Sequence, residues 1–454
     1  MRLADLAAKR VAIWGFGREG RASLKAIRSR FPHQPITVFC GEDEAVTIAA
    51  DRAVVAITTS PDADALSKFD VVIKSPGISP YKPPYIQAEA AGVRFRSGSA
   101  LWFAEHPDAR ALCITGTKGK STVAALIAHL LRKSGKCIAL AGNIGVPLLE
   151  LLDPPREPDW WVIELSSFQT RDFDGEPTIA VITNLYEEHL DWHASAERYF
   201  ADKLKVAAHA KKIVIAAQRE LIDATAWHSN VTVFDDPAGW HVANDAIYRG
   251  DQRIIETTQI ALPGLHNAHN VCAALAAVEA AGENAIELAL HVASFKPLPH
   301  RLQRLGERDG RWFVNDSIST TPYASVEALR SLGDAETAIL VGGFDRGVSW
   351  RIFVDYVAKH PPQAIVTMGA NGPAIARELR CVPNAHFVLV EVSSLADAVA
   401  RAREATHDGA TILLSPGAPS FDQFRDYAQR GQEFARLAGF DPSPVLRIEG
   451  MGIA

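Results

Sequence analysis

The stretch CITGTKGKSTV, residues 113–123, decides the fold of this chain. A short apolar run leads into a turn with two glycines and two lysines, and apolar residues at helical spacing follow. In such a strand–turn–helix unit, backbone N–H groups point at a phosphate, a lysine adds charge and a hydroxyl binds Mg²⁺. Helix capping by Ser121 or Thr122 would explain neither the glycines nor the lysines. The turn therefore predicts phosphate binding, although Ile114 stands where the usual loop has its first glycine.

The segment around this turn has the pattern of a parallel α/β domain. Residues 159–165 and 178–185 are apolar runs of strand length, and apolar residues recur at helical spacing through 123–131. Residues 266–282 predict a second, amphipathic helix. Two prolines within 295–301 mark a linker, so the segment ends there.

The N-terminal segment predicts a strand–turn–helix unit of its own. The apolar run Val11–Trp14 is followed by GFGREG at 15–20 and by a helix-like stretch to about Arg30. Enzymes that bind NAD place an acidic residue after the second strand, where this chain has Cys40 and Gly41. A tight turn without a dinucleotide is therefore at least as good an interpretation as a redox-cofactor site.

The C-terminal segment alternates strand and helix patterns. Apolar runs at 337–343, 364–369, 386–390 and 411–417 are separated by helix-like stretches such as 395–405. This alternation predicts a smaller, doubly wound α/β domain.

Composition indicates a folded, multidomain protein. The 454 residues are 48% hydrophobic and 22% charged, and the net charge of −6 provides no basic field for nucleic acid or anionic lipid. The five cysteines are scattered without metal-ligand spacing, so we expect reduced thiols. We see no signal-peptide pattern and no apolar run of membrane-spanning length, and expect a cytoplasmic location.

Polar residues follow the two buried strands of the central segment. Glu164 ends the first strand and Ser166 comes after it; a carboxylate there implies a metal or a basic partner. The loop after the next strand holds Asn184, Glu188, His189 and Asp191. One of these is a candidate ligand while the others cap a helix. A histidine in such a loop is more often structural, but its place beside a phosphate turn favours a ligand.

Five further residues are candidates with competing explanations. Lys203 lies in a helix-like stretch, where lysines are usually solvated. Asn267 and Asn270 share a helix face, and reading an adenine edge and capping the helix are equally good explanations for them. At the junction with the C-terminal segment, Arg301 is a candidate for a γ-phosphate and Asp316 for a ribose or a metal.

A series of motifs along nearly the whole chain resembles the Mur ligases, ATP-dependent enzymes that add amino acids to the cytosolic peptidoglycan precursor. The motifs are GTKGKST, GNIG, ELSSFQ, NLYEEHLD, DKLK, HNAHN, LPHR, NDS and QRGQEF. The family uses the short phosphate loop. SPGI at 75–78 and FDQFRDYAQRGQEFARLA at 421–438 are most similar to the branch that adds glutamate to UDP-N-acetylmuramoyl-L-alanine.

The resemblance implies a three-domain α/β architecture. Residues 1–98 would form a Rossmann-like domain for the UDP substrate, and 99–299 a central ATPase-type parallel-sheet domain for ATP and Mg²⁺. Residues 300–454 would form a dinucleotide-fold-like domain for the amino acid. The resemblance also implies the reaction: ATP phosphorylates the substrate carboxylate, and the amine of glutamate attacks the acyl phosphate.

The same resemblance assigns the site residues. Those for ATP would be Gly116, Thr117, Lys118, Gly119, Lys120, Ser121, Thr122, Asn270, Arg301 and Asp316. Those for the UDP substrate would be Gly15, Phe16, Gly17, Arg18, Ser75, Pro76, Gly77, Asn143 and Ser166. Ligands of Mg²⁺ would be Ser121, Thr122, Glu164, His189 and Lys203, with Lys203 carbamylated as in the family. The catalytic set would be Lys120, Glu164, His189 and Lys203, and the glutamate set Thr320, Arg346, Ser420 and Tyr427.

The chain departs from the glutamate-adding pattern around the incoming amino acid. Ile318 replaces a lysine, Gly417–Pro419 replaces Ala-Cys-Ala, and Tyr427 replaces a phenylalanine. Enantiomers differ only in where the amine and carboxylate point, so moving a few polar contacts reverses the preference. We therefore expect the branch that takes L-glutamate, with D-glutamate as the runner-up.

Two alternatives belong to other classes. One is an NAD-linked oxidoreductase, which rests on the Gly15–Gly20 turn, and the other is a non-catalytic nucleotide-binding regulator. Retention of Lys120, Glu164, His189 and Lys203 argues against the regulator. We expect a monomer whose partners are UDP-N-acetylmuramoyl-L-alanine and glutamate, with no nucleic-acid or membrane partner.

Overall fold

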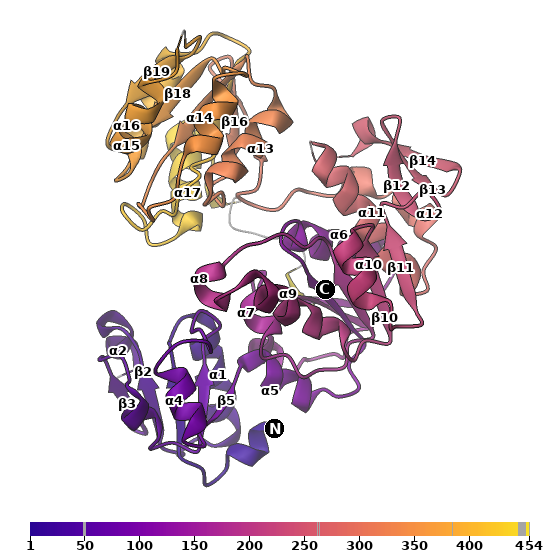
Figure 1. Cartoon of the computed structure of the whole chain (residues 1–454), viewed down its shortest axis with the longest axis vertical. Coiled ribbons are helices and arrows are strands. Elements are labelled where there is room, and N and C mark those ends of the chain that lie inside the picture. The colour runs from indigo at the N-terminus through magenta and orange to yellow at the C-terminus, as the bar shows by residue number, and fades with distance from the viewer. Residues whose placement is uncertain (49–50, 261, 263, 384, 444–450, 454) are drawn as a thin grey trace. The chain divides into compact units, whose positions relative to one another are not determined.

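The computed structural model describes residues 1–48, 51–260, 262, 264–383, 385–443 and 451–453. The chain forms two compact units, and Figure 1 labels many of their elements. The first comprises Met1–Gln259, Ala268–Phe295 and Gly450–Ala454, and the second Ile260–Asn267 and Lys296–Glu449. Among the described residues, no helix is long and apolar enough to cross a membrane.

The first unit opens with a five-stranded parallel sheet in the order β3-β2-β1-β4-β5. Its strands are β1 (Val11–Trp14), β2 (Ile36–Phe39), β3 (Val54–Ile57), β4 (Val71–Lys74) and β5 (Arg94–Arg96). Its helices are η1 (Leu3–Leu6), α1 (Arg18–Arg30), α2 (Glu42–Ile48), α3 (Ala63–Leu66) and α4 (Tyr85–Ala90). The predicted N-terminal strand–turn–helix unit is confirmed. Gly15 has a φ of 87°, and a Cβ at Gly20 would collide with the Gly15 carbonyl oxygen, so this turn requires both glycines.

A seven-stranded sheet in the order β11-β10-β9-β6-β8-β7-β21 follows. Its strands are β6 (Ala111–Thr115), β7 (Ile138–Gly142), β8 (Trp160–Glu164), β9 (Ile179–Ile182), β10 (Lys212–Ala216), β11 (Val231–Phe234) and β21 (Gly452–Ile453). Its α-helices are α5 (Gly98–Glu105), α6 (Lys120–Lys133), α7 (Ser167–Thr170), α8 (Leu190–His193), α9 (Ala196–Leu204), α10 (Arg219–Thr225), α11 (Leu265–Ala280) and α12 (Ala285–Ala289). Short 3-10 turns lie at η2 (Leu148–Leu151), η3 (Lys205–Ala207), η4 (Thr257–Gln259) and η5 (Val292–Ser294). All pairings are parallel except that of β21 with β7, and the three predicted strands are confirmed as β6, β8 and β9. Because β6 lies between β8 and β9, the phosphate turn and the loops after those strands meet at one sheet edge.

Three features of this unit differ from the sequence-based expectation. An antiparallel sheet of β12 (Trp240–Ala243), β13 (Ala246–Arg249) and β14 (Gln252–Glu256) was not predicted. Nor was the return of the chain at β21 to pair with β7. Helix α11 was expected to be amphipathic, but every residue from 271 to 278 is buried. Its many alanines let it pack closely on all sides.

The second unit contains a six-stranded sheet in the order β15-β16-β20-β17-β18-β19. The strands are β15 (Gln303–Arg308), β16 (Arg311–Asn315), β17 (Thr337–Val341), β18 (Ala364–Thr367), β19 (Val388–Glu391) and β20 (Thr411–Leu414). The helices are α13 (Pro322–Leu332), α14 (Arg351–Val357), α15 (Gly372–Arg380), α16 (Leu395–Glu404) and α17 (Tyr427–Ala438). Only β15 is antiparallel to its neighbour, so the predicted alternation of strand and helix is confirmed.

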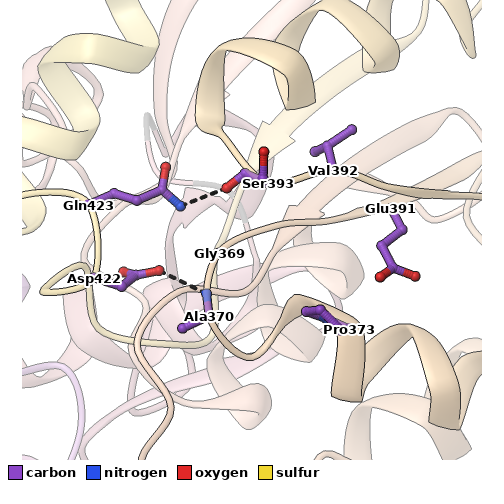
Figure 2. Close-up of a pocket in the computed structure, with 8 residues that line it drawn as sticks. All are labelled: Gly369, Ala370, Pro373, Glu391, Val392, Ser393, Asp422 and Gln423. Atoms are coloured by element: carbon purple, nitrogen blue, oxygen red, sulfur yellow. Dashed lines mark hydrogen bonds between the residues drawn. The ribbon is translucent and has the colours of Figure 1, made fainter.

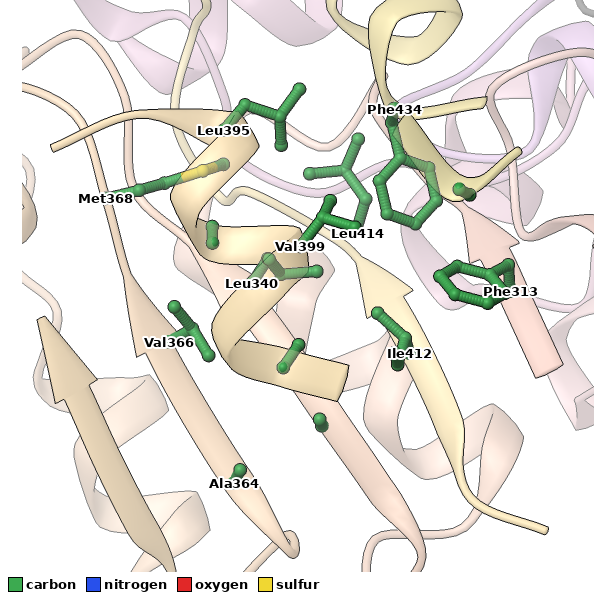
Figure 3. Packing of buried hydrophobic residues seen from close by; sticks show 14 residues of the cluster. Phe313, Leu340, Ala364, Val366, Met368, Leu395, Val399, Ile412, Leu414 and Phe434 are labelled. Carbon is green, nitrogen blue, oxygen red and sulfur yellow. The ribbon is translucent and has the colours of Figure 1, made fainter. Parts of the chain in front are cut away.

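Helices cover both faces of this second sheet. On one face, α16 and α17 pack against strand residues such as Phe313, Leu340 and Leu414 (Figure 3). On the other, α13, α14 and α15 pack against a cluster that includes Ile339 and Leu413. The doubly wound arrangement expected from the sequence is therefore present. The boundaries of the three predicted domains, after residues 98 and 299, stay predictions.

All five cysteines are free, as expected. Cys113 and Cys272 are buried among apolar residues, and burial raises the pKa of both thiols, which makes them unreactive.

Candidate active site

The phosphate turn has a backbone that only glycine adopts easily. Gly116 has a φ of 137° and Gly119, the residue before α6, a φ of 82°. A Cβ at Gly116 would collide with Thr183, and one at Gly119 with the side chain of Asn270. Glycine therefore lets this loop turn tightly against its neighbours, and the first N–H groups of α6 form an anion-binding end.

Three lysine ammonium groups lie at or next to the phosphate turn. Lys120 Nζ donates to the carbonyl oxygen of Thr117 at 2.8 Å, and Lys118 Nζ pairs with a Glu188 oxygen at 2.7 Å. Lys203 Nζ donates to the carbonyl oxygen of Gly116 at 2.6 Å. Two loop carbonyls and one carboxylate thus accept from the three ammonium groups.

Lys203 is not a solvated helix lysine. Only 1% of it is exposed, so the interpretation from spacing alone was wrong. Its role as a carbamylated metal ligand stays a prediction. Burial, and then the charge of Lys120, holds the pKa of Lys203 well below its ordinary value, although Glu188 and Glu164 oppose this. Lys203 is buried because α9 packs against the phosphate turn. The periodicity of a helix sequence does not predict such a tertiary contact.

Glu164 ends β8, and its two carboxylate oxygens differ in their hydrogen bonding. Its Oε1 accepts from Asn143 Nδ2 at 2.8 Å, whereas Oε2 is buried without a hydrogen-bond partner among the described residues. A buried, unpartnered carboxylate oxygen is costly unless a cation or donor binds it. This atom therefore fits one ligand position for a hard divalent cation.

His189 lies in the loop that precedes α8 and has a φ of 56°. Its Nε2 is 3.8 Å from Glu188 Oε2, and burial lowers the pKa of His189, which favours the neutral ring that ligates metals. Over the described part of the chain, however, no three His, Cys, Asp or Glu side chains are grouped as a complete metal site. Any cation here would need further oxygen ligands from hydroxyls, phosphate or water.

The two predicted groups for the UDP substrate are brought together in the N-terminal sheet. Ser75 Oγ donates to the carbonyl oxygen of Gly15 at 2.9 Å, which joins the SPGI loop to the glycine turn. Arg18 Nη1 donates to Gly145 O at 2.8 Å, at the end of the GNIG motif. Ser166 caps α7 by accepting from the N–H of Gln169.

The predicted residues of the second unit come from several loops: Asp316 and Thr320 follow β16, Arg346 follows β17, Ser420 follows β20, Tyr427 begins α17 and Arg301 precedes β15. Asp316 is buried and accepts from Leu302 N at 3.1 Å, from Ser415 Oγ at 2.8 Å and from Ser319 Oγ. Burial raises the pKa of Asp316, and these hydrogen bonds oppose the rise. In the predicted glutamate set, Ser420 is buried, Arg346 and Tyr427 are exposed, and Thr320 is intermediate.

A pocket of about 500 Å³ opens in the second unit at the ends of β18 and β19 (Figure 2). Asp422 accepts there from Ala370 N at 3.0 Å, and Gln423 Nε2 donates to Ser393 O at 3.0 Å. None of the predicted site residues lines it, but the N–H of its lining residue Gln423 donates to Ser420 O at 3.1 Å, so the pocket adjoins one member of the predicted glutamate set.

Comparison with known proteins decides the family. The family model of the Mur ligase middle domain matches residues 114–278. The UDP-N-acetylmuramoyl-L-alanine--L-glutamate ligase of Xylella fastidiosa strain Temecula1 is 50% identical over 100% of both chains. The enzyme of the same name from a Micromonospora species is 35% identical over 96% of this chain and 97% of the relative. This chain belongs to the Mur ligase family.

Solved Mur ligases share the fold. The UDP-N-acetylmuramate-alanine ligase of Thermotoga maritima superimposes with a TM-score of 0.62 at 17% identity, covering 94% of this chain and 98% of its own. The MurF ligase of the same organism, in complex with ADP, gives a TM-score of 0.57 at 15% identity and covers 96% and 94%. The predicted three-domain Mur ligase architecture is therefore confirmed. As a Mur ligase the chain is an ATP-dependent amide ligase, which replaces the oxidoreductase and regulator alternatives.

Sequence reasoning missed several polar residues of this Mur ligase. Arg430 is 1% exposed and donates to Ser317 Oγ and O at 3.1 and 2.8 Å; burial lowers its pKa to about 10. Tyr81, His193 and Asp202 are joined by hydrogen bonds near α9. The DKLK motif contains Asp202, and His193 lies two residues after the NLYEEHLD motif, but only packing brings both to Tyr81.

Proposed function

We propose that this chain joins L-glutamate to UDP-N-acetylmuramoyl-L-alanine with cleavage of ATP, in peptidoglycan precursor synthesis. The full-length match at 50% identity to a ligase of that name carries the proposal. The substitution of Ile318 for a lysine of the glutamate-adding pattern supports the L-enantiomer, because a lost cation requires the substrate carboxylates to bind elsewhere. The nucleotide-linked substrate and ATP are consistent with action in the cytoplasm.

The phosphate turn is the proposed ATP site. Lys120 would exchange its bond to Thr117 O for the β- and γ-phosphates, while the N–H groups of α6 hold phosphoryl oxygens. Asn270, next to Gly119, is in reach of the same loop and is proposed for adenine. Arg301 and Asp316 are proposed for the γ-phosphate and the ribose.

Divalent-cation binding is proposed at Glu164 and the hydroxyls that start α6. Glu164 Oε2 has no other partner among the described residues, and Ser121 and Thr122 begin the neighbouring helix. Mg²⁺ bound there would neutralise charge on the phosphoryl oxygens. His189 and a carbamylated Lys203 are proposed for a second ion.

Burial of Lys203 and its lowered pKa support the proposed carbamylation. A neutral amine adds to CO₂ and releases a proton, which gives an anionic carbamate. The product presents oxygen rather than nitrogen to a hard cation. Its charge would also complement Lys120, which at present disfavours the protonated form of Lys203.

The proposed reaction joins the two substrates through an acyl phosphate. The carboxylate of UDP-N-acetylmuramoyl-L-alanine attacks the γ-phosphorus and ADP leaves; the glutamate amine then attacks the acyl carbon, and phosphate and a proton are released. Residues 15–18 and 75–77, with Asn143 and Ser166, are proposed for the UDP substrate. Thr320, Arg346, Ser420 and Tyr427 are proposed for glutamate.

Phosphate release tests the proposal directly. Purified protein is given ATP, Mg²⁺ and UDP-N-acetylmuramoyl-L-alanine, with L- or D-glutamate added separately and Lys120→Ala as the blank. We expect turnover with L-glutamate and little with D-glutamate. Turnover with D-glutamate alone would assign the Ile318 change to drift, and no turnover with either would overturn the substrate assignment.

A further inference from the structure

Four polar side chains form a continuous hydrogen-bonded chain beside α9, called here the Asp202 network. Tyr81 Oη donates to Asp202, 2.9 and 2.7 Å from its two oxygens. His193 Nδ1 lies 2.8 Å from Asp202 Oδ2, and His193 Nε2 lies 3.0 Å from Ser167 Oγ. Asp202 Oδ2 and Ser167 Oγ are thus the hydrogen-bond partners of the two ring nitrogens of His193. Every member thus has a partner.

This order of groups resembles the triad of a serine hydrolase, but the setting does not. Ser167 is only 3% exposed and His193 is fully buried. Asp202 also accepts from Tyr81, so its lone pairs are not reserved for the histidine. A nucleophile closed off in this way serves packing and position rather than attack on a substrate.

The network and the phosphate turn contact α9 on different sides of the helix. Asp202 and Lys203 are consecutive on α9, so their side chains leave the helix about 100° apart. Asp202 reaches Tyr81 of the N-terminal sheet domain, whereas Lys203 reaches Gly116 O at 2.6 Å. Helices α7, α8 and α9 pack together around this point (Figure 1). A shift of Asp202 therefore moves Lys203 relative to the turn.

The same segment is tied to the SPGI loop at a second point. Ser79 Oγ donates to Trp192 O at 2.6 Å, and Trp192 Nε1 donates to Gly77 O at 3.0 Å. Gly77 belongs to the loop proposed for the UDP substrate. Residues 77–81 are thus connected by side-chain hydrogen bonds to α8 and α9, which carry the candidate ligand Lys203 and follow His189.

We propose that Tyr81, His193 and Asp202 are positioning residues that couple the UDP-substrate loop to the phosphate turn through Lys203. A substrate bound to residues 75–81 would restrict the motion of Tyr81 and, through its hydrogen bond, of Asp202. Because Asp202 precedes Lys203 on α9, this would also hold Lys203 at the Gly116 carbonyl. Coupling between two binding sites is reciprocal, so ATP strengthens binding of the UDP substrate by the same factor. The inference rests on the proposed function for the identity of the two ligands.

The test measures the Kd of a non-hydrolysable ATP analogue with Mg²⁺, with and without saturating UDP-N-acetylmuramoyl-L-alanine. Tyr81→Phe removes the hydroxyl that reaches Asp202 and keeps the ring. We expect a coupling factor of about 5 or more in the natural chain and a clearly smaller factor in Tyr81→Phe, which keeps the hydrogen bonds of Ser79 and Trp192. The Kd for the analogue alone should change less than about twofold, because Tyr81 touches no predicted ATP residue.

Tyr85→Phe is the matched control, because the Tyr85 hydroxyl bonds Glu89 within α4 and not the central domain. Equal coupling in Tyr81→Phe and the natural chain would overturn the inference, as would a factor near 1 in the natural chain. Covalent labelling of Ser167 by a fluorophosphonate would overturn it in favour of a hydrolase site. The ligand pair is measured without glutamate, so absence of glutamate turnover leaves this test valid and counts only against the proposed function.

Discussion

Lys203 Nζ donates to the carbonyl oxygen of Gly116 at 2.6 Å, in a site where only 1% of the lysine is exposed. A buried ammonium beside the N-terminal end of α6 and the charge of Lys120 is electrostatically unfavourable. The structure therefore lowers the pKa of this amine, so that loss of its proton costs less free energy than in water.

We expect substitution of Lys203 to lower turnover without preventing the chain from folding. Lys203→Met keeps the length and apolar stem but has no amine to carbamylate, so we expect turnover to fall by about 10²-fold or more. Carbon-13 NMR in ¹³C-bicarbonate should show a carbamate in the natural chain and none in Lys203→Met. A natural chain without that resonance but with full activity would contradict carbamylation.

Gly119→Ala should impair nucleotide binding through a specific collision. The new Cβ would meet the Asn270 side chain, so we expect the Kd for ATP analogue to rise about tenfold or more, equivalent to about 1.4 kcal/mol. Gly135→Ala is the matched control: its φ of 83° nearly equals the 82° of Gly119, but no atom lies within 4 Å of its Cβ. Equal weakening in both variants would show that backbone strain, not the contact, is responsible.

Glu19 predicts a pH dependence of stability. Burial raises its pKa from 4.5 to about 7, so the folded chain holds a proton that the unfolded chain releases between those values. Stability from this group is complete below pH 4.5 and declines as pH rises to about 7, by at most about 3 kcal/mol. Urea unfolding at pH 5 and pH 8 should show a smaller decline in Glu19→Gln than in the natural chain.

Glu42→Gln, at an exposed position, controls for loss of one acidic group. The same decline in Glu19→Gln as in the natural chain would exclude Glu19 as its source.

The pocket for the amino acid should respond to restored family residues. The double variant Ile318→Lys and Tyr427→Phe reintroduces a cation and removes a hydroxyl, so we expect the ratio of kcat/KM for L- over D-glutamate to fall about tenfold or more. Steady-state phosphate release with each enantiomer measures this ratio. An unchanged ratio would place the stereochemical preference elsewhere, with Gly417–Pro419 as the next segment to exchange.

Local sequence determined the elements that build this Mur ligase. The apolar runs, the glycine turns and the order of motifs predicted β1, β6, β8, β9 and the alternation of the second unit, because periodicity and turn chemistry act over a few residues. The same patterns placed Glu164 at the end of a strand and Lys120 at the start of a helix. These features depend only on neighbours in the chain.

Tertiary structure alone decided the burial of Lys203 and the hydrogen bond between Tyr81 and Asp202. It also decided that Glu164 Oε2 is buried without a hydrogen-bond partner among the described residues. The pairing of β21 with β7 and the burial of α11 on every side were decided in the same way. Each depends on residues far apart in the chain that packing brings within hydrogen-bond or van der Waals distance. A lysine on a helix has the same sequence pattern in water and against a phosphate turn, and only the fold decides which environment sets its charge.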